Sequence, residues 1–192
     1  MQEFPQFYAT DRTEWRQWLQ ENHATAKGVW LIYFKKSSGK IRVEYGEAVE
    51  EALCFGWIDS VAKPVDEFCY KQLFSPRKPK SNWSKLNKER VDILIESGLM
   101  TEAGFRMIDI AKQLGTWNAL NEVEQLIIPN DLQIAFDVNP IALQHWQKFS
   151  RSSRRGILEW LLNAKRPETR AKRITNIVEL AAQNIKANFL QK

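Results

Sequence analysis

The apolar pattern of the chain changes at Pro79, and this change restricts the folds that the chain can adopt. Before Pro79, short runs of aromatic and β-branched residues alternate with helical patterns, whereas apolar residues after it recur at helical spacing. This predicts an α+β protein with a small, mostly antiparallel sheet and helices in the N-terminal half and an all-helical C-terminal half. We expect a sheet-containing region over residues 1–80 and a helical region over residues 81–192 packed on it as one integrated domain, because 192 residues suit a single core with a helical extension.

Two helices and four strands are expected in the first region. Apolar residues at helical spacing place one helix at about 11–22, after a Thr10 or Asp11 cap, and another between Gly46 and the closing pair Phe55-Gly56. Runs rich in aromatic and β-branched residues place the strands at 29–34, 41–43, 57–61 and 68–74. A turn at residues 37–40 joins the first two strands, so the sequence predicts a hairpin there.

The second region is expected to be helical throughout. Helix starts are marked by Ser81 or Ser84, by Thr101, by Asn139-Pro140, by Ser152 or Ser153, and by Pro167 at a first helical position. In the first of these helices Trp83, Asn87 and Val91 fall at i, i+4 and i+8, which places Asn87 on the inward face if the helix begins early enough. An inward-facing Asn needs a hydrogen-bond partner.

Two motifs that lie close together in the sequence carry the candidate binding residues. Cys54–Ser60 contains Trp57 and Asp59, and the basic, proline-punctuated stretch Phe74–Ser84 contains Arg77, Lys80 and Trp83. The arginine offers a bidentate fork and the lysine a point charge to a phosphate or carboxylate. The two indole rings can stack on a planar group or a cation. Together they predict an aromatic and basic pocket for an anion or a peptide, with Asn87 as a further ligand-binding candidate.

A competing interpretation of the same residues is structural. Trp57 and Trp83 would then be core residues, Asp59 would cap a turn, and the lysines would form a solvated face. No set of catalytic residues is recognisable, and Asp59 is the one acid to test for catalysis. An Arg77→Ala variant separates the two interpretations, because loss of ligand binding without loss of stability indicates a site.

Positive charge is concentrated in two segments. Residues 71–90 carry seven Lys or Arg against one Glu, and residues 148–173 carry nine against two Glu, although the net charge of the chain is only +5. Such local patches steer anions to one part of a surface. Within the second segment Arg170 points partly inward, so it either clamps the two regions together by pairing with Asp59 or Glu51, or it binds an anion.

Several other kinds of chemistry are disfavoured. His23 and His145 have no neighbouring Cys or carboxylate at ligand spacing, so no metal site is expected. The sequence has no P-loop, GxGxxG or GxSxG motif, and no cofactor is predicted. Cys54 and Cys69 are expected to be buried free thiols in a reducing cytoplasm. No secretory signal or bilayer-length apolar run is found, so we expect a cytoplasmic protein without membrane insertion.

The motifs also carry a resemblance to a known family. It rests on Trp30-Leu31, Lys35-Lys36, Glu47–Ser60, Pro76-Arg77, Ser81–Ser84, Asn87 and Ala164–Ile174. Over roughly residues 7–182 the chain resembles the bacterial YdeI/OmpD-associated (OmdA) family. The resemblance implies a bacteriocin-protection protein, with some members linked to resistance to cationic peptides and to a porin, and it implies no established reaction. A porin partner requires export, so the porin link is not carried over to this chain.

Three functions from different classes remain as hypotheses. The first is a binding protein for a small anionic ligand or a protein or peptide partner, in peptide resistance or envelope stress. The second is an enzyme acting on a small anionic substrate, with Asp59 as acid or base and Arg77 as the anion clamp. The third and least favoured is a weak nucleic-acid binder, whose affinity would fall steeply with salt. The oligomeric state is left open.

Overall fold

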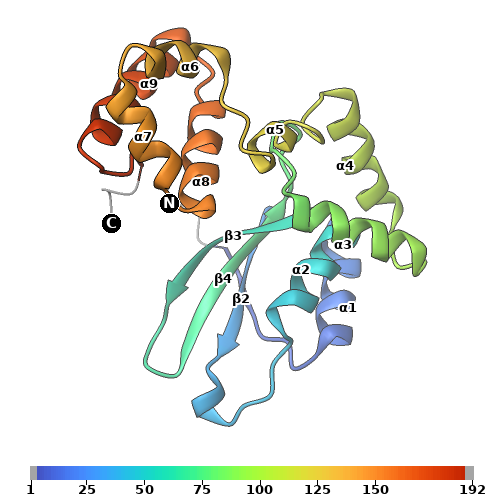
Figure 1. Ribbon diagram of the computed structural model, residues 1–192. Helices are drawn as coiled ribbons and strands as arrows, with labels where there is room; N and C mark the ends of the chain where they lie inside the picture. The colour runs from blue at the N-terminus through green and yellow to red at the C-terminus, as the bar shows by residue number, and fades with distance from the viewer. Residues whose placement is uncertain (1–3, 189–192) are drawn as a thin grey trace. The chain divides into compact units, whose positions relative to one another are not determined.

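The computed structural model describes residues 4–188 (Figure 1). The chain divides into two compact units, Met1–Ala119 and Leu120–Lys192, which are described separately. The first unit contains a four-stranded sheet with helices, and the second unit is helical in its described part. The predicted α+β class is therefore confirmed.

The sheet of the first unit is mixed. Its strands are β1 (Gln6–Phe7), β2 (Val29–Phe34), β3 (Trp57–Pro64) and β4 (Cys69–Pro76), in the spatial order β1-β2-β4-β3. The short edge strand β1 runs parallel to β2, whereas β4 is antiparallel to both of its neighbours. The prediction of a mostly antiparallel sheet is wrong in this respect, because the edge position beside β2 is taken by a parallel strand.

The expected hairpin after β2 is absent. Residues Lys36–Ser38 form a short 3-10 helix, η1, which ends at Gly39 with φ of 69°. The residues that follow form no strand, and the amide of Val43 donates to the carbonyl oxygen of Ala9 at 3.0 Å. Because the segment is tied to the N-terminal stretch, it runs away from β2 instead of pairing with it.

Four helices of the first unit share a core with the sheet. They are α1 (Arg12–Asn22), α2 (Tyr45–Cys54), α3 (Lys85–Glu96) and α4 (Glu102–Gln113). Asp11 caps α1 by accepting the amide of Glu14 at 3.0 Å, and Ser84 caps α3, as the sequence predicted. Residues from α1, α2 and the strands form one apolar cluster, and Val91 and Ile108 add α3 and α4 to it. The change of pattern at Pro79 therefore falls inside the first compact unit.

The second unit is a group of helices around its own core. They are α5 (Asn121–Glu124), α6 (Asn130–Asp137), α7 (Pro140–Lys148), α8 (Arg151–Leu162) and α9 (Pro167–Ala182). Their buried side chains include Phe136, Trp146 and Ile157. The predicted starts of α7 and α9 are confirmed, whereas α8 is capped by Ser150 and not by Ser152 or Ser153. No helix in residues 4–188 is long and apolar enough to cross a membrane. That residues 1–80 and 81–192 pack as one integrated domain stays a prediction.

Candidate functional site

Asp59 accepts hydrogen bonds from two side chains of the first unit. On β3 it lies opposite Phe74, whose side chain is in the core, so the carboxylate points to the helix-bearing face of the sheet. The hydroxyl of Tyr45, at the start of α2, donates to Oδ2 at 2.7 Å. The side-chain amide of Gln72 on β4 donates to the same oxygen at 3.2 Å. One carboxylate oxygen is thus held by donors from two different elements.

Two further tyrosines, Tyr33 and Tyr70, lie next to Tyr45. The rings of Tyr33 and Tyr70 are stacked with centroids 5.1 Å apart, and the rings of Tyr33 and Tyr45 lie 6.5 Å apart. Tyr33 is completely buried, and its hydroxyl has no hydrogen-bond partner within the described part of the chain. Burial and the surrounding groups raise its pKa strongly, so the hydroxyl stays protonated and remains available as a donor. We call Tyr33, Tyr45, Asp59, Tyr70 and Gln72 the Asp59 cluster.

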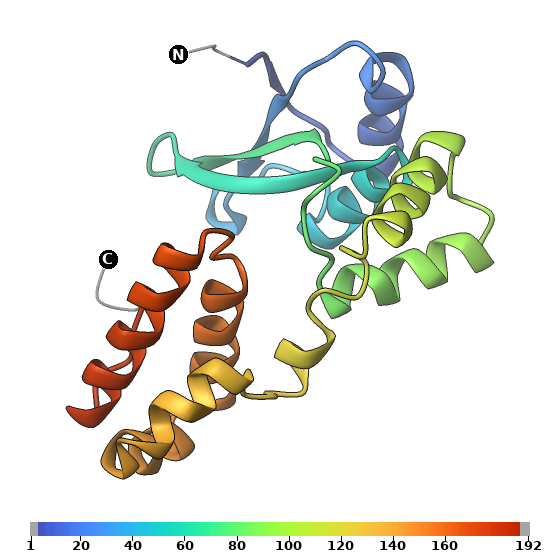
Figure 2. The same ribbon diagram turned by 90° about the horizontal axis from the view of Figure 1, so that it is seen from above.

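The pairing of β2, β3 and β4 brings the cluster together on the face of the sheet that the helices cover, near the edge of that cover. Tyr33 and Tyr70 are register partners in the β2–β4 ladder, and Gln72 is the partner of Leu31, so these side chains share one face. On β3 the register shifts between Asp59 and Ala62, which marks a bulge. Beyond it the strand residues are exposed, and the β3–β4 hairpin reaches past the helices of the first unit (Figure 2). Asp59 therefore lies where the helices stop covering the sheet.

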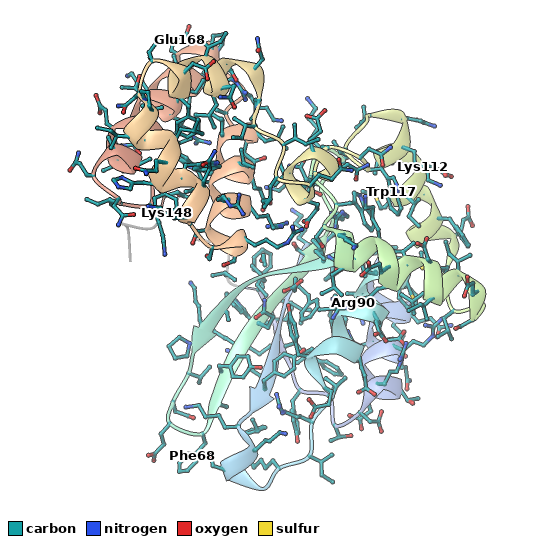
Figure 3. All side chains as sticks on the ribbon, in the orientation of Figure 1. Phe68, Arg90, Lys112, Trp117, Lys148 and Glu168 are labelled. Carbon is teal, nitrogen blue, oxygen red and sulfur yellow. The ribbon has the colours of Figure 1, made fainter. Side chains whose placement is uncertain are left out.

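Arginines stand around the cluster. The guanidinium carbon of Arg42 lies 5.6 Å from the centroid of the Tyr33 ring. Arg90, on α3, donates to Oδ1 of Asn87 at 3.1 Å and reaches toward α2 (Figure 3), where its Nη2 comes within 4.0 Å of the position that a Cβ on Gly46 would take. Asn87 thus has the partner that the sequence required, and it orients Arg90 toward the helix that carries Tyr45.

Arg77 is buried, and no carboxylate within residues 4–188 forms an ion pair with it. Its guanidinium carbon lies 3.7 Å from the centroid of the Trp83 ring, and its Nη2 donates to the carbonyl oxygen of Asn82. Nε has no hydrogen-bond partner in the part of the chain that the structure describes. Burial lowers the pKa of Arg77 to about 10, although the negative charge of Asp59 acts in the opposite direction. A buried cation in this state is an attractive position for an anion.

The remaining predicted site residues are placed differently. Trp57 and Trp83 are 1% and 2% exposed, so their rings pack in the core and the structure favours the core interpretation for both. Lys80 is exposed. Arg170 lies in the second unit, where its guanidinium binds Asp131 through two hydrogen bonds of 2.5 and 2.9 Å. The alternative in which Arg170 pairs with Asp59 or Glu51 is wrong, and Glu51 is instead bound by Arg12 and Arg16. Anion binding by Arg170 stays a prediction.

Much of the basic segment 148–173 is engaged in contacts inside the second unit. Arg155 forms ion pairs with Glu124 and Glu159 at 2.6 and 2.8 Å. Arg173 lies over the ring of Trp160 at 4.6 Å from its centroid, and Arg151 donates to the carbonyl oxygen of Glu124. These contacts reduce the charge that the segment can offer to a nucleic acid.

Two family models match the chain, one in each compact unit. Residues 7–107, just over half of the chain, match the family model described as Domain of unknown function (DUF8412). The chain belongs to this family. Residues 125–184 match a second model, described as Bacteriocin-protection, YdeI or OmpD-Associated (OmdA), which confirms the suspected resemblance over these residues. The motifs between Trp30 and Asn87 on which the resemblance also rested lie in the DUF8412 match. No curated protein and no solved structure matches the chain. The Asp59 cluster lies in the DUF8412 region, and Arg170 lies in the OmdA region.

Sequence reasoning missed most of the Asp59 cluster and the arginines beside it. It singled out Asp59 but not the three tyrosines, Gln72, Arg42 or Arg90. One signal was available, because Gln72 stands two residues before Phe74 in a strand and so shares its inward face. A polar residue in that position must be satisfied by a partner or serve a site.

Tyrosine ionisation provides a first test of this geometry. Burial and the hydrogen bond to Asp59 raise the pKa of Tyr45 from its ordinary value of 10.0 to about 12. The folded state therefore holds this proton more tightly, and the stability that Tyr45 contributes is present below pH 10 and is lost as the pH rises toward 12. We expect phenolate absorbance of the native protein to show a late step that Tyr45→Phe removes and that Asp59→Asn shifts to lower pH. Asp92→Asn, on the exposed side of α3, is the control, and an equal shift there would refute the assignment.

Proposed function

We propose that this protein is a binding protein of the bacteriocin-protection type, and that its Asp59 cluster binds a small anionic ligand. The observation that carries the proposal is the buried Tyr33 hydroxyl, which has no partner in the described residues although it lies among Asp59, Tyr45 and Arg42. Buried hydroxyls are rarely left without a hydrogen bond, because each one costs about 1–3 kcal/mol. A ligand atom that accepts this hydrogen bond would remove the cost.

The charges around the cluster favour an anion. Arg77 and Arg90 form no ion pair with any described carboxylate, and the ion pair of Arg42 with Glu44 is long, at 3.8 Å. A carboxylate or phosphate could accept from these guanidinium groups and from Tyr33. Tyr45 and Gln72 both bind Oδ2 of Asp59, so a hydroxyl or amine of the ligand would donate to Oδ1. The favoured ligand is a small carboxylate or phosphate that also carries a hydrogen-bond donor.

The same residues are also compatible with the enzymatic hypothesis. Asp59 would then act as acid or base on a substrate held by the arginines. The raised pKa of Tyr45 makes it a donor that fixes Asp59, and a poor base at neutral pH. An incubated ligand that is recovered altered would establish an enzyme, and one recovered unchanged would establish a binding protein.

Tyr33→Phe tests the proposal sharply, because binding and stability should change in opposite directions. Removal of a buried hydroxyl without a partner is expected to raise the free energy of unfolding by about 1 kcal/mol. Loss of the donor should weaken ligand binding by about tenfold. Thermal shifts with inorganic phosphate, a sugar phosphate and citrate measure binding, and chemical denaturation of the free protein measures stability. Asp59→Asn should also weaken binding, whereas Tyr8→Phe, outside the cluster, should not.

Two other classes of partner serve as comparisons in the same screen. A short RNA that shifts melting only at low salt would support the nucleic-acid hypothesis. A cationic peptide that shifts melting equally in wild type and Tyr33→Phe would place peptide binding elsewhere on the chain. The proposal fails if none of the anions shifts the melting temperature, or if Tyr33→Phe loses stability and keeps its affinity for them.

A further inference from the structure

An open hollow lies between β1 and α1, away from the Asp59 cluster. It has a volume of about 360 Å³ and is lined by Phe7, Tyr8, Glu14, Gln17, Trp18 and Glu21. The last four of these follow one another at i, i+3, i+4 and i+7, so they share one face of α1. The helix therefore presents two carboxylates, one amide and one indole to the same space, opposite two aromatic residues from the N-terminal stretch.

The lining of this hollow is negatively charged and is not neutralised locally. Arg12 and Arg16, the two arginines of α1, are bound to Glu50 and Glu51 of α2 and so serve the opposite side of the helix. Neither Glu14 nor Glu21 forms an ion pair with any residue between 4 and 188. Glu14 accepts a hydrogen bond from the backbone N–H of Thr10 at 2.8 Å, and Glu21 accepts one from the side-chain amide of Gln17 at 3.1 Å. These bonds hold the carboxylates in place and leave their charge uncompensated.

The aromatic residues of the hollow are fixed by core contacts. The ring of Trp18 is stacked on the buried Trp15 with centroids 5.3 Å apart, and it meets Trp57 edge-on at 5.8 Å. Phe7 packs against Trp18 at 5.8 Å. Trp18 and Phe7 are each only half-buried, so the rigid rings remain accessible from the hollow. A preorganised aromatic surface loses little conformational freedom when it binds a ligand.

We propose that this hollow binds a small organic cation of the quaternary ammonium class. Aromatic faces attract such a cation through the ring quadrupole, and nearby carboxylates add a charge attraction. Glu14 and Glu21 are both exposed, and no three ligating side chains gather in the described residues, so the arrangement suits a diffuse organic charge better than a compact metal ion. The inference uses other residues than the Asp59 cluster and does not depend on the function proposed above.

The test compares choline with its uncharged analogue, in which carbon replaces the ammonium nitrogen. The indole N–H resonances of the eight tryptophans are followed by NMR on the full chain, and Trp18→Phe identifies the resonance of Trp18. We expect choline to shift that resonance in a saturable way, and the analogue to bind about fivefold more weakly or not at all. Equal binding of the two compounds would overturn the proposal, as would the absence of a saturable shift.

Charge-neutralising variants then locate the site. The double variant Glu14→Gln/Glu21→Gln keeps both hydrogen-bond acceptors and removes both charges, so we expect about fivefold weaker choline binding at an unchanged melting temperature. Glu96→Gln/Glu102→Gln makes the same change in net charge at exposed positions on α3 and α4, and should bind choline as the wild type does. If this control loses affinity equally, the cation responds to the overall charge of the protein and the assignment to the hollow is wrong.

Discussion

Gly104→Ala is expected to destabilise the first unit by about 3 kcal/mol or more. A Cβ on Gly104 would lie 2.4 Å from the carbonyl oxygen of Cys54 and 2.6 Å from the terminal methyl of Met100. The methyl group can move, but the carbonyl belongs to the last turn of α2 and is held by two donors from Thr101, the amide at 3.2 Å and the hydroxyl at 2.6 Å. Relief of the contact therefore requires α4 to separate from α2.

This close approach matters for the candidate site, because α2 carries Tyr45 at its other end. Gly56 lies in the same contact, with φ of +71° and a Cβ position 2.9 Å from the carbonyl oxygen of Ala103. The turn at Gly56 leads directly into β3, where Asp59 lies three residues further on. Displacement of α4 should thus disturb both groups that form the hydrogen bond between Tyr45 and Asp59.

Gly46→Ala provides a matched control for Gly104→Ala. The same methyl group is added near the start of α2, where the nearest atom is Nη2 of Arg90 at 4.0 Å, an ordinary contact. Replacement of glycine by alanine in a helix is stabilising by up to about 1 kcal/mol, and less near its first turn. Chemical denaturation should therefore give shifts of opposite sign for the two variants. If both variants change the free energy of unfolding equally, or if Gly104→Ala lowers it by less than about 1 kcal/mol, α2 and α4 are not in close contact at Gly104.

Local signals in the sequence predicted the helices better than the sheet. Asp11, Ser84 and Pro167 mark helix starts because a cap or a fixed φ acts within one turn of the chain. The two-residue strand β1 carries no such signal, since Gln6 and Phe7 are extended only because the edge of β2 offers them hydrogen bonds. Contacts between residues far apart in the sequence could not be predicted either. Arg170 is an example, because its partner Asp131 lies on α6, a helix for which no pattern was recognised.

The candidate site was predictable only where a local sequence pattern marked its residues. Asp59 stands out as an acid within apolar sequence, and Arg77 as part of a basic, proline-punctuated stretch. The structure places Asp59 on the helix-bearing face of the sheet and buries Arg77 directly after β4. The tyrosines escaped notice because aromatic residues in strands usually belong to the core, and only the β2–β4 register stacks Tyr33 on Tyr70. The tryptophans drew attention by their chemistry, yet 1% and 2% exposure leaves them as packing residues.

Two substitutions at Arg77 are expected to separate its structural role from its role in binding. Its side chain is 5% exposed and covers the ring of Trp83, so Arg77→Ala should leave a cavity and destabilise the first unit by about 2–4 kcal/mol. Arg77→Met fills most of that volume and removes a buried charge whose lowered pKa corresponds to an opposing cost of roughly 3 kcal/mol. The hydrogen bond to Asn82 is lost in both variants. We therefore expect Arg77→Met to lie within about 1 kcal/mol of the wild type.

Anion binding should not distinguish these two variants. If the guanidinium of Arg77 binds the ligand of the Asp59 cluster, Arg77→Met and Arg77→Ala both lose the thermal shift that phosphate or citrate gives the wild type. Lys80→Met, which removes a charge from the exposed part of the same segment, should keep that shift. A stable Arg77→Met protein that still binds anions would make Arg77 a packing residue. In that case binding would give no reason for the chain to keep a charge at a buried position that disfavours it. Loss of anion binding in Arg77→Met would give such a reason, because the bound anion compensates the buried charge.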